Sequence, residues 1–194
     1  MVGFVLFLVT RLAMDNNATR GKNVRLFLSF TKQINFNGSS MRYWLMKTEP
    51  SDCSIDDLAG MPNQTVAWYG VRNYQARNFM RDQMRVDDGV LFYHSNCTPP
   101  GIVGIARVAS TAYPDATQFE RSSKYFDPKA TPETPRWFNV DVQLVKKIQH
   151  IPISELRQHQ KLEKMRALQR GNRLSITPLD PAEWNFILKH LVRD

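Results

Sequence analysis

The sequence predicts an α+β protein, built as a small mixed β-barrel with helices packed on its outside. Many short apolar segments typical of strands alternate with short helical segments along residues 41–194. Turn signals such as Asp88-Gly89 and Pro99-Pro100-Gly101 separate them. The length of 194 residues suits one domain that can bury a sizeable core.

Short apolar runs give the strands of the predicted barrel. The longest, 137–148, places its apolar side chains at even positions and therefore on one face. Gly104 permits a bulge or a close backbone approach. The predicted strands are 43–47, 66–68, 90–95, 102–108, 137–148 and 174–178.

Capping residues and helical periodicity give the helices. Asn73 can cap the second of them, and Pro181 lies near the start of the last. Residues 112–136, rich in Pro, Asp, Ser and Thr, form a long loop of the kind that is usually functional or flexible. The predicted helices are 55–58, 73–83, 153–159, 162–168 and 181–191.

Residues 1–40 are predicted to be an extension outside the fold, with residues 41–194 forming the domain. Residues 2–9 make an apolar run that is too short to span a bilayer. The run lacks a positively charged leading segment, which disfavours a signal peptide. A targeting or membrane segment is the alternative interpretation. The sequence therefore favours a protein with no membrane partner.

The net charge and the cysteine content indicate which partners, cofactors and cellular compartment to expect for this protein. The net charge of +8 is shared equally between residues 1–40 and residues 41–194. A mildly basic domain is compatible with phosphate contacts and equally with a role in solubility alone. Cys53 and Cys97 are too few and too far apart for a disulfide framework or a zinc site. We therefore expect a cytoplasmic protein without a metal or another cofactor.

Polar side chains follow two apolar segments in a way that is typical of a small-molecule or nucleobase pocket. Lys47, Thr48 and Glu49 end the first strand, where Lys47 and Glu49 share one side. We favour the interpretation that these two side chains form an ion pair that lines a cavity. The alternative is that they form a proton-transfer pair. Ser95 and Asn96 end a later strand and are suited to hydrogen bonding at a rim.

The segment 68–78 has both a structural and a functional interpretation. Trp68 is either a core side chain or a surface on which a flat ligand stacks. Asn73 can cap a helix or offer a donor and an acceptor to a base edge. Arg72, Arg77 and Arg81 could meet phosphates, or Arg77 and Arg81, one helical turn apart, could belong to a solvated face.

Catalytic motifs are weak in this sequence. His94 lies three positions from Cys97, but a lone His at the end of a strand is usually a hydrogen-bonded spacer. Ser95 and His94 are strand neighbours that point apart, which disfavours a catalytic triad. Residues 101–104 lack the Lys-Ser/Thr ending of a phosphate-binding loop. These features favour a binding module over an enzyme.

Several motifs resemble the EVE domain family, over about residues 41–192. They are Tyr43-Trp-Leu-Met-Lys-Thr-Glu-Pro50, Trp68-x-Gly-Val-Arg-Asn-Tyr-Gln-Ala-Arg-Asn78, Leu91-Phe-Tyr-His-Ser-Asn96, Pro100-Gly-Ile-Val-Gly104 and Arg170-Gly-Asn-Arg-Leu-Ser175. The resemblance implies a PUA-like fold related to the YTH and ASCH domains. It also implies a pocket for a modified nucleobase, such as modified cytosine in DNA or a modified base in RNA.

The resemblance also suggests the residues of that pocket. Trp68 matches one aromatic wall by its order along the chain, and Tyr125 or Phe126 would supply the second. The nucleic-acid backbone would meet Arg72, Arg77 and Arg173. The polar side would consist of Lys47, Thr48, Glu49, Asn73, Tyr93, Ser95 and Asn96.

We therefore expect a non-catalytic module that binds a modified base in DNA or RNA. Trp68→Ala is predicted to abolish that binding and to shift the melting temperature by only a few degrees. The alternatives are an enzyme that acts on a modified base or nucleotide through Lys47 and Glu49, and a protein-interaction module.

Overall fold

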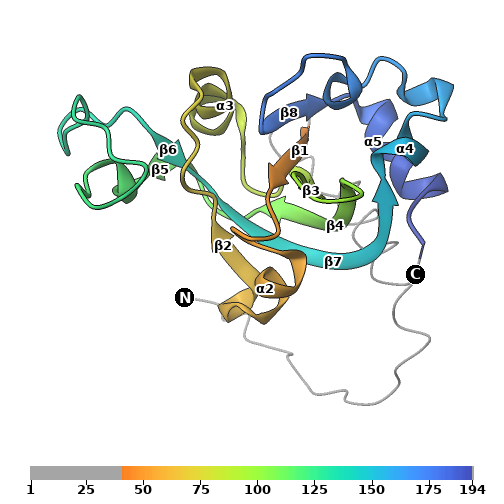
Figure 1. Ribbon diagram of the computed structural model, residues 1–194, viewed down its shortest axis with the longest axis horizontal. Coiled ribbons are helices and arrows are strands. Elements are labelled where there is room, and N and C mark those ends of the chain that lie inside the picture. Colours follow the sequence, from red (N-terminus) through yellow and green to blue (C-terminus); the bar gives the residue numbers. More distant parts are fainter. Residues whose placement is uncertain (1–40, 194) are drawn as a thin grey trace, which may run out of the picture. The chain divides into compact units, whose positions relative to one another are not determined.

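A strongly curled sheet of six strands forms the centre of the molecule in the computed structural model, which describes residues 41–193 (Figure 1). Its strand order is β2-β7-β4-β3-β1-β8. Within these residues the β1–β3 pair is parallel and the other pairs of this sheet are antiparallel. The predicted α+β class with a small mixed barrel-like sheet is confirmed. The predicted extension, 1–40, lies outside the described residues.

The strands largely match the predicted ones. Residues 137–148 are divided between two strands, β6 and β7, and β7 continues four residues further than predicted. A separate two-stranded ribbon pairs β5 with β6. The strands are β1 Tyr43–Thr48, β2 Thr65–Ala67, β3 Gly89–His94, β4 Gly101–Val108, β5 Tyr113–Pro114, β6 Phe138–Asn139, β7 Asp141–Pro152 and β8 Ile176–Leu179.

The helices are short, and several of the helical elements are single 3-10 turns. Residues 73–83 form an α-helix that widens into a π-helical turn, because the Met84 amide bonds to the Phe79 carbonyl. The predicted helix 162–168 is wrong: non-helical backbone at Met165, with ψ of 119°, separates two 3-10 turns. The helical elements are α2 Ile55–Gly60, η1 Pro62–Gln64, α3 Tyr74–Asn78, η2 Phe79–Gln83, η3 Ala116–Gln118, α4 Ile153–Leu156, η4 Gln160–Leu162, η5 Arg166–Leu168 and α5 Pro181–His190.

Helix ends are fixed by the residues that the sequence suggested. The Asn73 side chain accepts a hydrogen bond from the Ala76 amide and caps α3. Pro181 occupies the first turn of α5, behind a capping box made by Asp180 and Glu183. Among residues 41–193, no helix has the length and apolar character needed to cross a bilayer.

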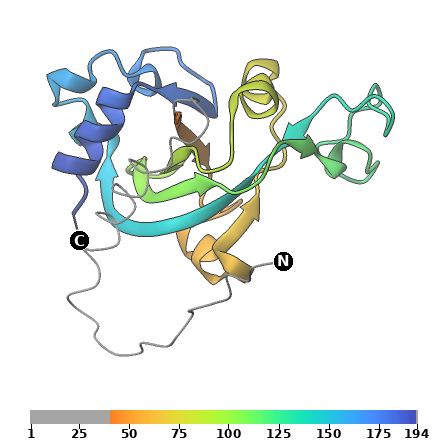
Figure 2. The same cartoon turned by 180° about the vertical axis from the view of Figure 1, so that it is seen from behind.

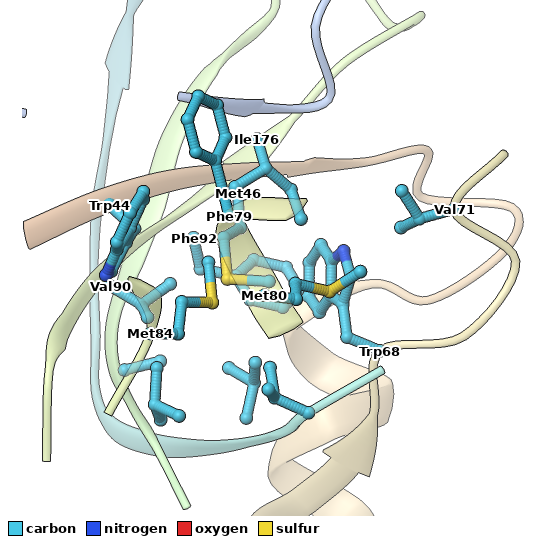
Figure 3. Close-up of a cluster of buried hydrophobic side chains, with 14 of the residues drawn as sticks. Trp44, Met46, Trp68, Val71, Phe79, Met80, Met84, Val90, Phe92 and Ile176 are labelled. Carbon is cyan, nitrogen blue, oxygen red and sulfur yellow. The ribbon is translucent and has the colours of Figure 1, made fainter. Parts of the chain in front are cut away.

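The central strands are buried on both faces. Trp44, Met46 and Phe92 pack into a cluster inside the curl of the sheet, which also contains Trp68 (Figure 3). Leu45 alternates with them, is fully buried and points to the opposite face. That face also holds the stacked rings of Tyr43 and Trp184, 4.6 Å apart, and is covered by α5 (Figure 2). The first strand is therefore continuously apolar until it ends at the polar residues of interest.

The curl of the sheet depends on bulges in β4 and β7. The pairing register of these strands shifts between Ile102 and Gly104 and again between Ile105 and Ala106. A side chain at Gly104 would begin 2.5 Å from the Ile55 Cδ1 atom, so α2 approaches the sheet closely there. The bulge predicted near Gly104 is confirmed, whereas the close approach there is made by the Ile55 side chain and not by backbone.

The loop 112–136 is held together by buried polar side chains. The Gln118 amide donates to the carbonyls of Asp115 and Trp137, and its oxygen accepts from the backbone of Arg136 and Trp137. Both Asp115 and Gln118 are almost completely buried. The loop projects beside β5 and β6 as an ordered arm (Figure 1).

Candidate functional site

A cavity of about 480 Å³ opens where β1 and β2 end and the loop 112–136 folds back. Its walls come from five separate parts of the chain, so only the folded domain assembles it. Polar lining residues are Lys47, Thr48, Glu49, Asp52, Arg72, Ser95, Lys124, Arg173 and Ser175. The other lining residues are Cys53, Met61, Val66, Ala67, Trp68, Tyr69, Gly70, Val71 and Tyr125.

Trp68 forms an aromatic wall of the cavity while also belonging to the core. It is 8% exposed, and its ring meets Phe92 edge-on at 5.6 Å. Its backbone amide donates to the Val140 carbonyl, which fixes the ring to the sheet. The indole N–H has no hydrogen-bond partner within residues 41–193 and is available to a bound molecule.

Tyr125 supplies a second aromatic wall from the loop. Its ring lies against Gly70, where a β-carbon would stand 2.6 Å from a ring atom. Gly70 also has φ of +80°, a conformation that favours glycine. Phe126, the other candidate for this wall, is not among the lining residues and is 38% exposed.

The Arg72–Asp115 ion pair holds Tyr125 in place. The Arg72 Nη1 atom lies 2.8 Å from the Asp115 carboxylate, and its Nε donates to the Tyr125 carbonyl at 2.9 Å. The guanidinium carbon also lies 5.2 Å from the centre of the Tyr125 ring and 5.3 Å from that of the Trp137 ring. Arg72 lines the cavity, but it makes its hydrogen bonds with other groups of the protein. Its predicted phosphate contact stays a prediction.

Asp115 is a functional support that sequence reasoning missed. Burial raises the pKa of its carboxyl, but hydrogen bonds from Thr117, Arg72 and the Gly70 amide outweigh that effect and hold the pKa below its usual value. Asp115 lies in a loop rich in Pro, Asp, Ser and Thr, so its sequence surroundings are the same as those of an Asp in an exposed turn. No sequence signal distinguished it.

Two cations face the cavity without a carboxylate partner. Lys47 Nζ lies 5.9 Å from the centre of the Tyr93 ring and makes no ion pair or hydrogen bond with any residue of 41–193. Burial lowers the pKa of its ammonium group. Arg173 is exposed and likewise forms no ion pair within the described part of the chain. Both can meet a negatively charged or polar ligand.

Glu49 and its neighbours form the acidic side of the cavity. The Glu49 carboxylate accepts a hydrogen bond from the Asn96 side chain at 3.1 Å. Ser95 donates to the Thr48 carbonyl at 3.2 Å. Lys47 and Glu49 line the same cavity, as expected, but the ion pair predicted between them is not formed within the described residues. Their charges are therefore directed separately at the cavity.

Four predicted site residues lie outside the lining. Asn73 caps α3, and Tyr93 is 4% exposed beneath Lys47. Asn96 acts through Glu49. Arg77 donates to the Arg136 carbonyl and to the Asn78 side chain, so its groups are also used internally. The roles proposed for these four in ligand binding remain predictions.

The lining also contains residues that the sequence did not single out. Met61, Val66 and Val71 add apolar surface, and Ser175 adds a hydroxyl beside Arg173. Ser175 ends one of the quoted family motifs, which was the available signal. Within residues 41–193 no three His, Cys, Asp or Glu side chains gather as a metal site. Both cysteines are unpaired, and burial raises the pKa of the Cys53 thiol.

Comparison with known proteins identifies the family. A family model described as the EVE domain matches residues 42–190. The chain belongs to the EVE domain family. Mouse thymocyte nuclear protein 1 is 42% identical over 192 residues, covering 90% of this chain and 84% of that protein. A fission yeast protein described as uncharacterized is 37% identical over 160 residues, covering 75% of this chain and 66% of that protein.

Solved EVE structures share the fold. Human THYN1 protein, crystallised in complex with 5-methylcytosine containing DNA, is 43% identical with a TM-score of 0.71. The alignment covers 76% of this chain and 95% of the human one. A protein from Pseudomonas putida is 45% identical, also with a TM-score of 0.71, over 75% of this chain and 97% of the bacterial one. The resemblance inferred from the motifs is confirmed.

The observed packing revises one expectation about Trp68. A small change in melting temperature on Trp68→Ala would require an indole that contributes little to the core. Instead the ring is buried against Phe92 and belongs to the main apolar cluster. Removing it leaves a cavity as well as a missing wall. Binding experiments therefore need a substitution that preserves apolar volume.

His94 has a structural role that makes stability depend on pH. Its Nε2 atom accepts a hydrogen bond from the Ile55 amide at the start of α2, at 3.0 Å, which requires an unprotonated nitrogen. Burial lowers its pKa, and the positive charges of His150 and Lys147 act in the same direction. Asp56 and Asp57 oppose them.

We expect the free energy of unfolding to fall on acidification below about pH 6.5, the ordinary pKa of His. The folded state holds His94 neutral, so the unfolded state binds the extra proton and stability is lost as the pH falls through the lowered pKa. Urea unfolding between pH 7.5 and 5 measures this. His94→Gln should show a shallower dependence over that range. An identical pH dependence in both proteins would refute this role of His94.

Proposed function

We propose that this protein is a non-catalytic module that binds 5-methylcytosine in DNA. The observation that carries the proposal is the cavity between Trp68 and Tyr125, with aromatic walls and separate positive and negative groups. Its volume lies within the range of roughly 300–1,000 Å³ of small-molecule sites. The human relative crystallised with 5-methylcytosine containing DNA supports this choice of ligand.

The lining chemistry suits the edge of cytosine. Cytosine presents an exocyclic amine donor, which a carboxylate such as Glu49 can accept. Its ring nitrogen and carbonyl oxygen are acceptors, suited to the ammonium of Lys47 and the indole N–H of Trp68. The apolar surface of Met61 and Val66 gives the methyl group a place away from water. A single 5-methylcytosine base would thus contact the aromatic, charged and apolar parts of the lining.

The base must leave its stack to enter the cavity. Unstacking costs a few kcal/mol, and stacking on Trp68 returns about 1–3 kcal/mol. Affinity therefore depends on a well-formed aromatic wall. It also depends on contacts that the rest of the strand makes outside the cavity.

Binding without chemistry is the favoured mode because the candidate catalytic groups are engaged or unsuited. Asn96 holds Glu49 by a hydrogen bond, and the raised pKa of Cys53 keeps it a thiol. The enzymatic alternative draws support from one feature, the lowered pKa of Lys47. A lowered pKa equally accompanies any half-buried lysine that awaits an uncharged ligand.

A paired-oligonucleotide titration tests the proposal. We expect tighter binding to a duplex with one 5-methylcytosine than to the same duplex with cytosine, at fixed salt. A single methyl group contributes about 1–3 kcal/mol, or roughly 10- to 200-fold. Equal affinity for the two duplexes would rule out the reader function. The modified base should be recovered intact by mass spectrometry after prolonged incubation, whereas conversion would favour the enzymatic alternative.

A further inference from the structure

The segment 157–173 has a larger net positive charge than the +4 of residues 41–194 as a whole. It contains six Lys and Arg side chains against Glu163, a net charge of +5 out of +8 for the whole chain. It runs from the end of α4 through η4 and η5 to the start of β8 (Figure 1, in blue). All six cations are exposed. They are Arg157, Lys161, Lys164, Arg166, Arg170 and Arg173.

These six cations differ from three arginines elsewhere in the domain that are neutralised by the protein. Arg72, Arg107 and Arg136 each form an ion pair with an aspartate. Within residues 41–193, none of the six cations of 157–173 has a carboxylate partner. Two of them rest near aromatic rings, Lys161 at 5.5 Å from Phe186 and Arg166 at 6.0 Å from Phe79. Their positive charge is therefore not neutralised by the protein.

The backbone beneath these cations is fixed. Leu162 and Met165 are fully buried and anchor the segment to the core. The Gln169 side chain donates to the Glu163 carbonyl, and the Asn172 side chain donates to the Arg166 carbonyl. Uncharged amides thus hold the turns together, which leaves the charged side chains for another partner. A fixed backbone lowers the entropy cost of binding with them.

The basic segment leads directly into the cavity. Its last cation, Arg173, lines the cavity together with Ser175. The Ser175 carbonyl accepts a hydrogen bond from the Lys47 amide at 2.7 Å, which ties the segment to the end of β1. A strand whose base occupies the cavity would pass Arg173 as it leaves.

We propose that the segment 157–173 binds the phosphodiester backbone of the DNA that flanks the base held in the cavity. This inference rests on the proposed function for its ligand, and it assigns the phosphate contacts to this segment rather than to Arg72 and Arg77. Several exposed cations without carboxylate partners, carried on a fixed backbone, are suited to contacts with successive phosphates of a strand. Such contacts are independent of sequence and of methylation.

The salt dependence of binding tests this assignment. The test variant is the double substitution Lys164→Gln and Arg170→Gln, at two exposed side chains that form no hydrogen bond, ion pair or ring contact within residues 41–193. The control is Arg121→Gln with Lys129→Gln, two exposed cations of the loop 112–136 that form no ion pair within residues 41–193. Both double variants lose two positive charges. Affinity for methylated and unmethylated duplexes is measured from 50 to 300 mM salt.

We expect the test variant to lose about 1.8 from the slope of log affinity against log salt, at about 0.9 for each phosphate contact. Affinity for both duplexes should fall by the same factor, and the control should keep the slope of the unaltered protein. An unchanged slope in the test variant overturns the inference, as does an equal loss in the control. If the unaltered protein binds both duplexes equally while the test variant loses slope, the reader function fails and this inference stands.

Discussion

Replacing Trp68 with leucine is expected to weaken binding of 5-methylcytosine DNA by a factor of about 5 to 150, the equivalent of 1–3 kcal/mol. The aromatic face and the indole N–H are lost, and most of the apolar volume against Phe92 is kept. Trp68→Ala, in contrast, should also lower the free energy of unfolding by about 3–5 kcal/mol. Its loss of binding would therefore be ambiguous.

Trp184→Leu is the matched control for this experiment. Trp184 is 1% exposed in α5, stacks on Tyr43 and does not line the cavity. The control should lose stability, measured by urea unfolding, while retaining the affinity of the unaltered protein in a fluorescence-anisotropy titration. If Trp68→Leu and Trp184→Leu bind the methylated duplex equally well, stacking on Trp68 is not the basis of recognition.

Much of the fold could be predicted because its central strands are continuously apolar. Strands could be predicted at residues 43–47 and 102–108 because each is an apolar run that ends in polar or turn residues. The runs are apolar because these strands are buried on both faces. The last helix was found from Pro181 at its first turn. The failure at 162–168 has a local cause: buried Leu162 and Met165 have the i, i+3 spacing of a helix, but Leu162 ends η4 and Met165 precedes η5.

The site was predictable where it lies at the ends of strands, and less so where it depends on the loop. Lys47, Glu49 and Ser95 were found because polar side chains follow apolar strands. Tyr125 was found only through the resemblance to the EVE family. Asp115, which supports it, was missed because a buried carboxylate reveals itself by its hydrogen bonds and not by its neighbours in sequence.

Asp115→Ala is expected to lower the free energy of unfolding by about 3–5 kcal/mol and to weaken DNA binding. Its carboxylate is 1% exposed and is the ion-pair partner of Arg72, so its removal leaves a partly buried guanidinium without compensation. The Gly70 amide also loses its acceptor. The Tyr125 carbonyl accepts a hydrogen bond from Arg72 and its ring lies against Gly70, so Tyr125 should then lose its fixed position.

Asp115→Asn separates charge from shape in this prediction. The amide oxygen can still accept from the Gly70 backbone, so the loss of stability should be smaller than for alanine, while the attraction to Arg72 is lost. The ionised Asp115 carboxylate has a lower pKa in the folded state than the ordinary Asp value of about 3.9, so it stabilises the fold fully above about pH 3.9. That stabilisation is lost as the pH falls through the lowered pKa. Stability of Asp115→Asn should therefore depend less on pH in that acidic range, measured by urea unfolding. Equal stability of all three proteins at neutral pH would show that the Arg72–Asp115 pair does not hold the loop.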